Sequence, residues 1–216
     1  MNAALPITRR RAHVLRSRSA FSDGAARRGF TLVEASIALA LTAVAGTALL
    51  LSVTNSTDET DEAMKTLIAE GMAQQLLDEV SGMRYMENGA SAYDTFLGPG
   101  TPEQAVAARS LYDDIDDYNG STSQPPVDRW GVTRGSDSTG GATRHPAFQL
   151  GSGYFSRWRQ TVSVFYVRDT SPTTPVGGST TTDYRAVQVR ITFDDPVQGT
   201  RELANALRVV SYVPMP

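Results

Sequence analysis

Residues 27–53 read Arg-Arg-Gly-Phe-Thr-Leu-Val-Glu-Ala-Ser-Ile-Ala-Leu-Ala-Leu-Thr-Ala-Val-Ala-Gly-Thr-Ala-Leu-Leu-Leu-Ser-Val. The last 19 of these residues, Ala35–Val53, include no charged residue and no Pro, Asn or Gln. As an α-helix that rises 1.5 Å per residue, this run would be roughly 29 Å long, close to the ~30 Å hydrocarbon thickness of a bilayer. The run therefore predicts one membrane-spanning helix.

The charges are distributed unevenly on the two sides of this run. Residues 1–29 contain seven Arg and one Asp, a net charge of +6, whereas the rest of the chain has 13 basic and 22 acidic residues, a net charge of −9. An excess of positive charge before an apolar segment is typical of a segment held on the cytoplasmic side of a membrane. We therefore expect residues 1–29 to be a cytoplasmic leader and the C-terminal part to be extracytoplasmic.

A single carboxylate, Glu34, lies four residues after Phe30 at the start of the apolar sequence. A charge at membrane depth costs about 2.5–3.5 kcal/mol or more, and such residues usually have a partner and a function. An ordinary secretory signal has a shorter apolar stretch, and a plain membrane anchor gives no reason for the acid. A glutamate solvated by lipid headgroups is the alternative interpretation.

The sequence Arg27–Glu34, followed by an apolar helix, resembles the processing site of type IV pilins and type II secretion pseudopilins. The resemblance implies that a prepilin peptidase cuts after Gly29 and methylates the new N-terminus at Phe30. It implies that Glu34 pairs with the α-ammonium of a neighbouring subunit and so sets the axial register of a filament. Many type IV pilins have a proline in this run, whereas residues 7–98 contain none, which favours a minor subunit.

The same resemblance implies a location and a set of partners. The location is the bacterial inner membrane, crossed once. The partners are the prepilin peptidase, other pilin or pseudopilin subunits, the inner-membrane assembly platform and membrane lipid. The tip pseudopilin commonly lacks the glutamate, and Glu34 is present here. The resemblance does not distinguish a type II secretion system from a type IV pilus.

Residues 54–86 are expected to form an amphipathic helix that covers a sheet. Apolar residues recur there at steps of three and four, which places them on one helical face: Met64, Leu67, Ile68, Met72, Leu76, Val80 and Met83. The polar run 54–62 marks the exit from the membrane. It leaves open whether the helix continues through it or restarts.

The last third of the chain alternates between apolar and polar residues. Arg157–Val167 and Tyr184–Phe193 read as strands, and Leu207, Val209 and Val213 continue the pattern. Ser171–Thr182 reads as a flexible hairpin tip or a disordered loop. The fold class predicted is α+β, a long N-terminal helix packed on a small antiparallel sheet, as in pilins. The predicted divisions are residues 1–29 (leader), 30–53 (transmembrane and assembly helix), 54–86 (amphipathic helix), 87–147 (loop-rich insertion) and 148–216 (sheet).

The insertion contains a candidate helix and an acidic run. Thr101-Pro-Glu-Gln104 predicts a short helix to about Leu111. The acidic run Tyr112–Gly120 is interpreted as a structural or solvated loop, with a calcium site or a catalytic carboxylate pair as alternatives. An EF-hand register starting at Asp114 fails because Tyr118 would occupy its fifth position.

Several classes of function are excluded or disfavoured by composition. The chain has no Cys, and His145 is the only histidine after the leader. No Gly-x-Ser-x-Gly, phosphate loop or His-x-x-x-His pattern occurs, so we expect no enzyme activity, no cofactor and no metal. A charge of −9 disfavours nucleic acid, and Arg157 and Arg159 around Trp158 are the only candidate patch. The alternatives to a filament subunit are a single-span, membrane-anchored extracytoplasmic binding protein and, with less support, an anchored hydrolase.

Overall fold

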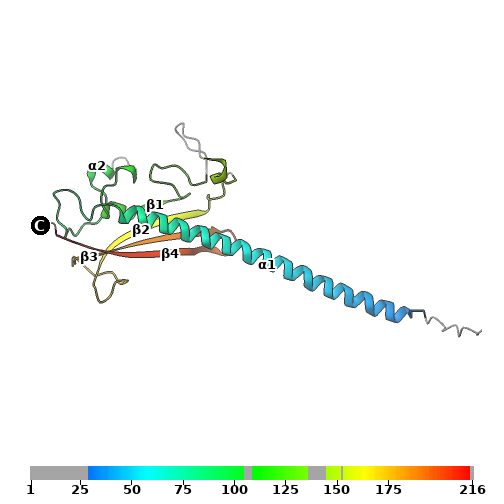
Figure 1. The fold of residues 1–216 in the computed structure, drawn as a ribbon. Helices are drawn as coiled ribbons and strands as arrows, with labels where there is room; N and C mark the ends of the chain where they lie inside the picture. Colours follow the sequence, from blue (N-terminus) through cyan, green and yellow to red (C-terminus); the bar gives the residue numbers. More distant parts are fainter. Residues whose placement is uncertain (1–28, 105–108, 136–144, 152, 215–216) are drawn as a thin grey trace, which may run out of the picture. The chain divides into compact units, whose positions relative to one another are not determined.

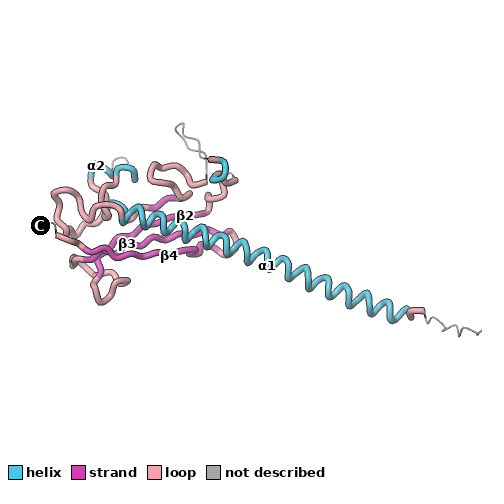
Figure 2. The backbone as a smooth tube through the Cα atoms, in the orientation of Figure 1, coloured by secondary structure: helices cyan, strands magenta, loops and turns pink. Residues whose placement is uncertain are grey.

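The computed structural model describes residues 29–104, 109–135, 145–151 and 153–214. The predicted leader before Gly29 and the middle of the predicted helix 101–111 lie outside the described residues. The chain divides into two units, residues 1–52 and 53–216. Figures 1 and 2 show the helices and strands. The α-helices are α1 (Leu32–Ser81) and α2 (Thr101–Gln104), and short 3₁₀ helices occur at Arg109–Leu111, Asp116–Tyr118 and Pro146–Phe148. The strands are β1 (Thr122–Ser123), β2 (Trp158–Val167), β3 (Tyr184–Asp195) and β4 (Gly199–Ser211).

Helix α1 is continuous through the polar run 54–62. The hydroxyls in this run are compatible with a helix because they bond back to it. The Thr57 hydroxyl donates to the Val53 carbonyl at 2.7 Å, and the Thr60 hydroxyl donates to the Ser56 carbonyl at 2.8 Å. Lys65 pairs with Asp61 at 3.0 Å, four residues earlier on the same face.

The predicted end of the helix at residue 86 is wrong, because α1 ends at Ser81. Gly82 follows, and glycine has a low helix propensity. The next backbone groups bond to the insertion instead of continuing the helix. The Ile115 N–H donates to the Arg84 carbonyl at 2.9 Å, and residues 84 and 114 form a parallel β-bridge.

The four strands form one antiparallel sheet in the order β1-β2-β3-β4, which confirms the α+β, pilin-like fold class. Strands β2, β3 and β4 come from the predicted strand regions. Strand β1 comes from the insertion and was not predicted, because two residues are too few to show a period. The sequence patterns thus predicted three strands, whereas the described residues form four.

The core lies between α1 and one face of the sheet. Helix α1 buries residues 69, 72, 73, 76, 77 and 80 against inward-facing side chains of β2 and β3, among them Trp158, Val162, Val187, Val189 and Ile191. The prediction is wrong for Met64 and Leu67, which are 49 % and 68 % exposed. Contacts at this earlier level of α1 are polar, because Glu62 forms an ion pair with Arg201.

Strand β4 turns a different set of side chains to the core from the one expected. Leu207 lies opposite Gln188 and Val209 opposite Ala186, so both face away from α1. Ala206, opposite Val189, packs against the core instead. Val213 follows the strand and is 74 % exposed. The alternation in β4 is disturbed by a shift of register at residues 191 and 192 of β3, where β4 carries one extra residue.

The loop between β2 and β3 is bonded to β2. The Val176 N–H donates to the Tyr166 carbonyl at 2.8 Å, and the Thr182 hydroxyl donates to the Val167 carbonyl at 2.6 Å. The expectation of a flexible or disordered segment at 171–182 therefore does not hold at these two points.

Arg185 of β3 is completely buried and joins four parts of the domain. Its guanidinium donates to Asp116 Oδ1 at 2.6 Å, to the carbonyl of Tyr85 and to the carbonyl of Ala92 at 3.3 Å. It also lies 3.1 Å from the Tyr166 hydroxyl and stacks on the Tyr85 ring at 4.4 Å. One cation thus fixes the segment after α1, the acidic run and strand β2 relative to β3.

The acidic run folds into a tight turn whose carboxylates bind its own backbone. Asp114 Oδ1 accepts the N–H groups of Asp116 at 3.0 Å and Asp117 at 3.1 Å. Asp117 Oδ2 accepts the N–H groups of Asp113 at 2.9 Å and Asp114 at 3.2 Å. Asp114 and Asp117 are buried, so the structural interpretation holds for them and a merely solvated run does not.

We expect Arg185→Met to lower the free energy of unfolding of the C-terminal unit by about 3–5 kcal/mol, because it leaves the Asp116 carboxylate and the Tyr85 carbonyl without the guanidinium that donates to them. The matched control is Arg190→Met on the same strand. Arg190 is exposed and lies 3.6 Å from Glu202, so its loss should cost less than about 1 kcal/mol. Denaturant unfolding of the full chain in detergent, followed by near-ultraviolet circular dichroism, measures both. Equal losses would contradict the role of Arg185.

The stability of the domain should also depend on the protonation of Asp114. Burial, followed by the charges of Asp116 and Asp117, raises the pKa of Asp114 to about 7, whereas an unfolded Asp titrates near ~3.9. Between pH ~3.9 and about pH 7, Asp114 is protonated in the folded state and ionised in the unfolded state. The free energy of unfolding therefore falls as the pH rises through this range. Wild type should lose stability relative to Asp114→Asn from about pH 4 to about pH 7. Parallel pH profiles of the two proteins would be inconsistent with a raised pKa.

Candidate processing and assembly segment

Helix α1 begins with a capped first turn immediately after the predicted cleavage site. The Glu34 N–H donates to Thr31 Oγ1 at 3.1 Å, and the Ala35 N–H donates to the Thr31 carbonyl at 3.0 Å. Thr31 is therefore the N-cap and Glu34 the third helical residue, in the Thr-x-x-Glu spacing of a capping box. Gly29 and Phe30 precede the helix and are exposed. This cap was not predicted, although the Thr31-x-x-Glu34 spacing in the sequence is a signal for it.

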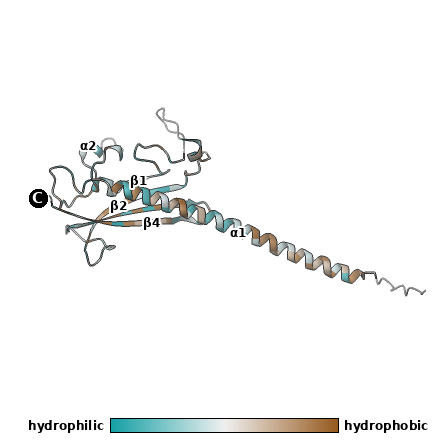
Figure 3. Ribbon diagram, viewed as in Figure 1, coloured by the Kyte–Doolittle hydropathy of each residue, from teal (hydrophilic) through white to brown (hydrophobic). Residues whose placement is uncertain are grey.

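Every residue of the apolar run of α1 is exposed, and Figure 3 shows this part of the ribbon mostly in the hydrophobic and neutral colours. Apolar residues from Phe30 to Val53 are more than half exposed, including Ile37, Leu41 and Leu49. The helix is long and apolar enough to cross a membrane. None of the residues in its most apolar stretch is buried against the rest of the protein. A helix that is apolar all round needs lipid or other helices around it.

Hydroxyl groups in the apolar run are satisfied within the helix. Ser36, Thr42 and Thr47 each donate to the carbonyl four residues earlier, at 2.7–2.8 Å. Such bonds make a hydroxyl tolerable in hydrocarbon, where no water replaces a missing partner. Glu34 is different, because it is exposed and forms no ion pair with another described residue.

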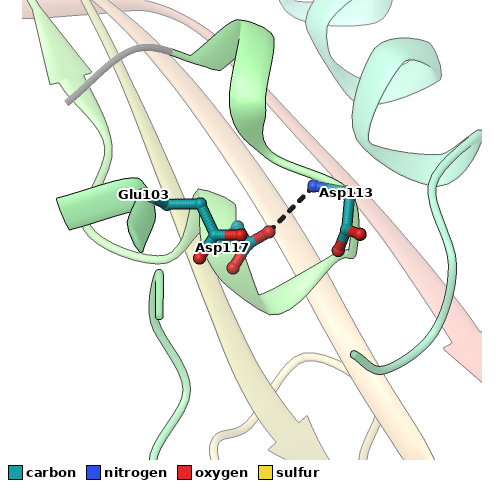
Figure 4. Close-up of side chains that lie close together, drawn as sticks. All are labelled: Glu103, Asp113 and Asp117. Carbon is teal, nitrogen blue, oxygen red and sulfur yellow. Dashed lines mark hydrogen bonds between the residues drawn. The ribbon is translucent and has the colours of Figure 1, made fainter. Parts of the chain in front are cut away.

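A second group of acidic side chains lies in the insertion. Glu103, Asp113 and Asp117 offer carboxylate oxygens within 4.8 Å of one another (Figure 4). Asp117 is buried, and burial raises the pKa of its carboxyl. Its Oδ2 already accepts two backbone N–H groups, and Glu103 accepts the Gly100 N–H at 2.6 Å. Hydrogen bonds within the chain therefore account for the positions of Glu103 and Asp117.

The remaining candidate residues have structural positions. His145 caps the 3₁₀ helix Pro146–Phe148, where its Nδ1 accepts the Ala147 N–H at 3.2 Å. Trp158 is buried in the core, and Arg159 lies 3.7 Å from Asp194. The structure therefore does not combine Trp158 and Arg159 into an exposed patch with an aromatic surface.

Comparison with known proteins yields one match. Residues 24–50 match the family model of the prokaryotic N-terminal methylation motif, and this segment includes Gly29, Phe30 and Glu34. No curated protein and no solved structure matches the chain. The motif implies processing by a prepilin peptidase and assembly with other pilins, and together with the single apolar helix it fits a membrane-anchored pilin. The chain thus carries the prepilin-type methylation motif, which supports its assignment to the pilin and pseudopilin family.

Proposed function

We propose that this protein is a minor structural subunit of a type II secretion pseudopilus or a type IV pilus. In this proposal it is made as a precursor, cut by prepilin peptidase after Gly29 and methylated at Phe30. The leader stays on the cytoplasmic side of the inner membrane, and the C-terminal domain is extracytoplasmic. The domain divisions given above belong to the same proposal, with the end of the helix moved from residue 86 to Ser81.

The observation that carries the proposal is the position of one acid at the start of a capped apolar helix. Cleavage after Gly29 would remove the +6 leader and create an α-ammonium at Phe30, an opposite charge for a carboxylate. In a water-poor bundle of helices, a buried charge without a partner is strongly unfavourable. A Glu34 carboxylate of one subunit and a Phe30 ammonium of the next would therefore favour one axial register over others.

The alternatives predict a different chemistry at the N-terminus. A plain anchor of an extracytoplasmic binding protein would keep its leader and tolerate the loss of Glu34. An anchored hydrolase would need a catalytic group, and the motif is one of structural subunits. The C-terminal domain uses its buried carboxylates, Asp114 and Asp117, to bind its own backbone.

Processing is the first test of this proposal. Co-expression with a prepilin peptidase should shorten the wild-type chain by 29 residues, a loss visible as faster gel migration. Gly29→Val should stay at full length, because a side chain at the cleavage site obstructs the peptidase. Leader removal in Gly29→Val at the wild-type rate would contradict cleavage at this site.

Assembly is the second test. Glu34 carries a charge and is also part of the N-terminal cap of α1, so two variants are needed to separate these roles. Glu34→Leu should be processed and inserted normally, because removing a charge makes the helix more stable in lipid. Its crosslinking to neighbouring subunits in the native membrane should fall at least about tenfold, which corresponds to about 1.4 kcal/mol of lost interaction.

The matched variant Glu34→Gln separates the charge from the cap. Glutamine can replace glutamate in a capping box, but it cannot form an ion pair. If the charge pair governs assembly, Glu34→Gln should fail as Glu34→Leu does. Restored crosslinking with Glu34→Gln would mean that Glu34 acts only by starting the helix.

A further inference from the structure

The two edges of the sheet differ in how their backbone groups are satisfied. The outer edge of β2 is paired along its length. It forms a ladder with β1 at residues 160 and 161. Beyond β1, Val162 exchanges hydrogen bonds with Gly120 and Ser121, the Val164 N–H donates to Asn119 Oδ1 at 2.9 Å, and the Tyr166 carbonyl accepts the Val176 N–H.

The outer edge of β4 has no such cover within the described part of the chain. The Tyr212 N–H donates to the Asp183 carbonyl at 2.7 Å. Tyr212 therefore points its backbone N–H toward the β3 side. In an antiparallel ladder, residues whose backbone groups point toward the neighbouring strand alternate with residues whose backbone groups point outward. The N–H and C=O groups of Asn205, Leu207 and Val209 thus point away from β3. No described strand pairs with them. The strand has 13 residues and contains no Pro or Lys, the residues that commonly protect an edge.

A groove of about 350 Å³ runs between this edge and helix α1. Its walls are Glu70, Ala73 and Gln74 of α1 and residues 202–206 of β4. Three of the lining side chains, those of Ala73, Ala204 and Ala206, are small. The helix and the strand are joined at both sides of the groove, by the Glu62–Arg201 ion pair and by the Asp78–Arg208 ion pair at 2.8 Å.

The charges of the groove indicate what kind of strand it would accept. Glu70 has no cation partner among the described residues. Glu202 pairs with Arg190 at 3.6 Å, and its register opposite Thr192 places its side chain on the face of the sheet away from α1. A second copy of this chain would offer Arg201 and Arg208 from its own β4, but both are already paired with carboxylates of α1. The groove therefore favours a different chain that brings its own basic side chains.

We propose that the edge of β4 binds an extended segment of another protein as an additional antiparallel strand. Its basic side chains would face α1 near Glu70, and its apolar side chains would lie on the other face, beside the half-buried Leu207 and Val209. Main-chain hydrogen bonds would supply the affinity, and the alternation of side chains would supply the specificity. The inference rests on the sheet and on α1, and it does not depend on cleavage after Gly29.

Peptide binding to the unprocessed full chain in neutral detergent tests the proposal, so its outcome is independent of the processing test. The probe is a short fluorescein-labelled peptide in which Lys and Val alternate, and fluorescence anisotropy measures its affinity. A peptide of equal length with alternating Glu and Val should bind at least about tenfold more weakly. Glu70→Lys should weaken binding of the Lys-Val peptide similarly, whereas Glu87→Lys, the same charge change at an exposed residue outside the groove, should not.

Two N-methylated peptides test the backbone pairing without altering the protein. In an antiparallel pair, the residues that bond to Leu207 share its face, so they are the Val residues of the probe. N-methylation of the Val residues should abolish binding, and N-methylation of the Lys residues should preserve it. Binding of the Val-methylated peptide, loss of the Lys-methylated one or equal binding of the Glu-Val control would each overturn the proposal.

Discussion

The packing of α1 on one face of the sheet, from Ala69 to Val80, is the contact on which the rest of the structure depends. Strands β2 and β3 turn their apolar side chains toward this part of the helix, and burial of those side chains is the main favourable term in folding. Because the helix is amphipathic only here, the same element can be apolar all round before Val53 and still belong to a water-facing domain after it. The insertion adds hydrogen bonds and the buried side chains of Tyr112, Ile115 and Tyr118 to this frame.

Much of this frame could be predicted from the sequence. A long run without charge or proline predicts a helix, and period-two alternation predicts strands, so the class of fold and the positions of β2 and β3 follow from local patterns. The end of the helix and the inward face of β4 did not follow. They depend on non-local bonds, such as that between Ile115 and Arg84, and on the extra residue that shifts the register of β4.

The buried polar cluster illustrates a different limit. Arg185 is separated from Val187 and Val189 by two and four residues, so its side chain is on the same face of the strand. The strand pattern therefore already indicated a guanidinium on the core face. That signal is specific, yet its partners lie about 70 to 100 residues away in sequence, at Asp116 and Tyr85, and no local pattern connects them. Similarly, the acidic run was interpreted as a structural or solvated loop, and its composition did not indicate that two of its carboxylates would bind the backbone of their own turn.

The functional interpretation depends on the chemistry of a single peptide bond, that between Gly29 and Phe30. Before cleavage, Glu34 has no intramolecular cation in the described helix. After cleavage, each subunit would carry both an ammonium and a carboxylate within one turn of each other. The most direct measurement is the identity of the N-terminal residue of the protein isolated from its native membrane, by tandem mass spectrometry of the terminal peptide. The account predicts N-methylated Phe30, and a terminal peptide that still contains residues before Gly29 would contradict it.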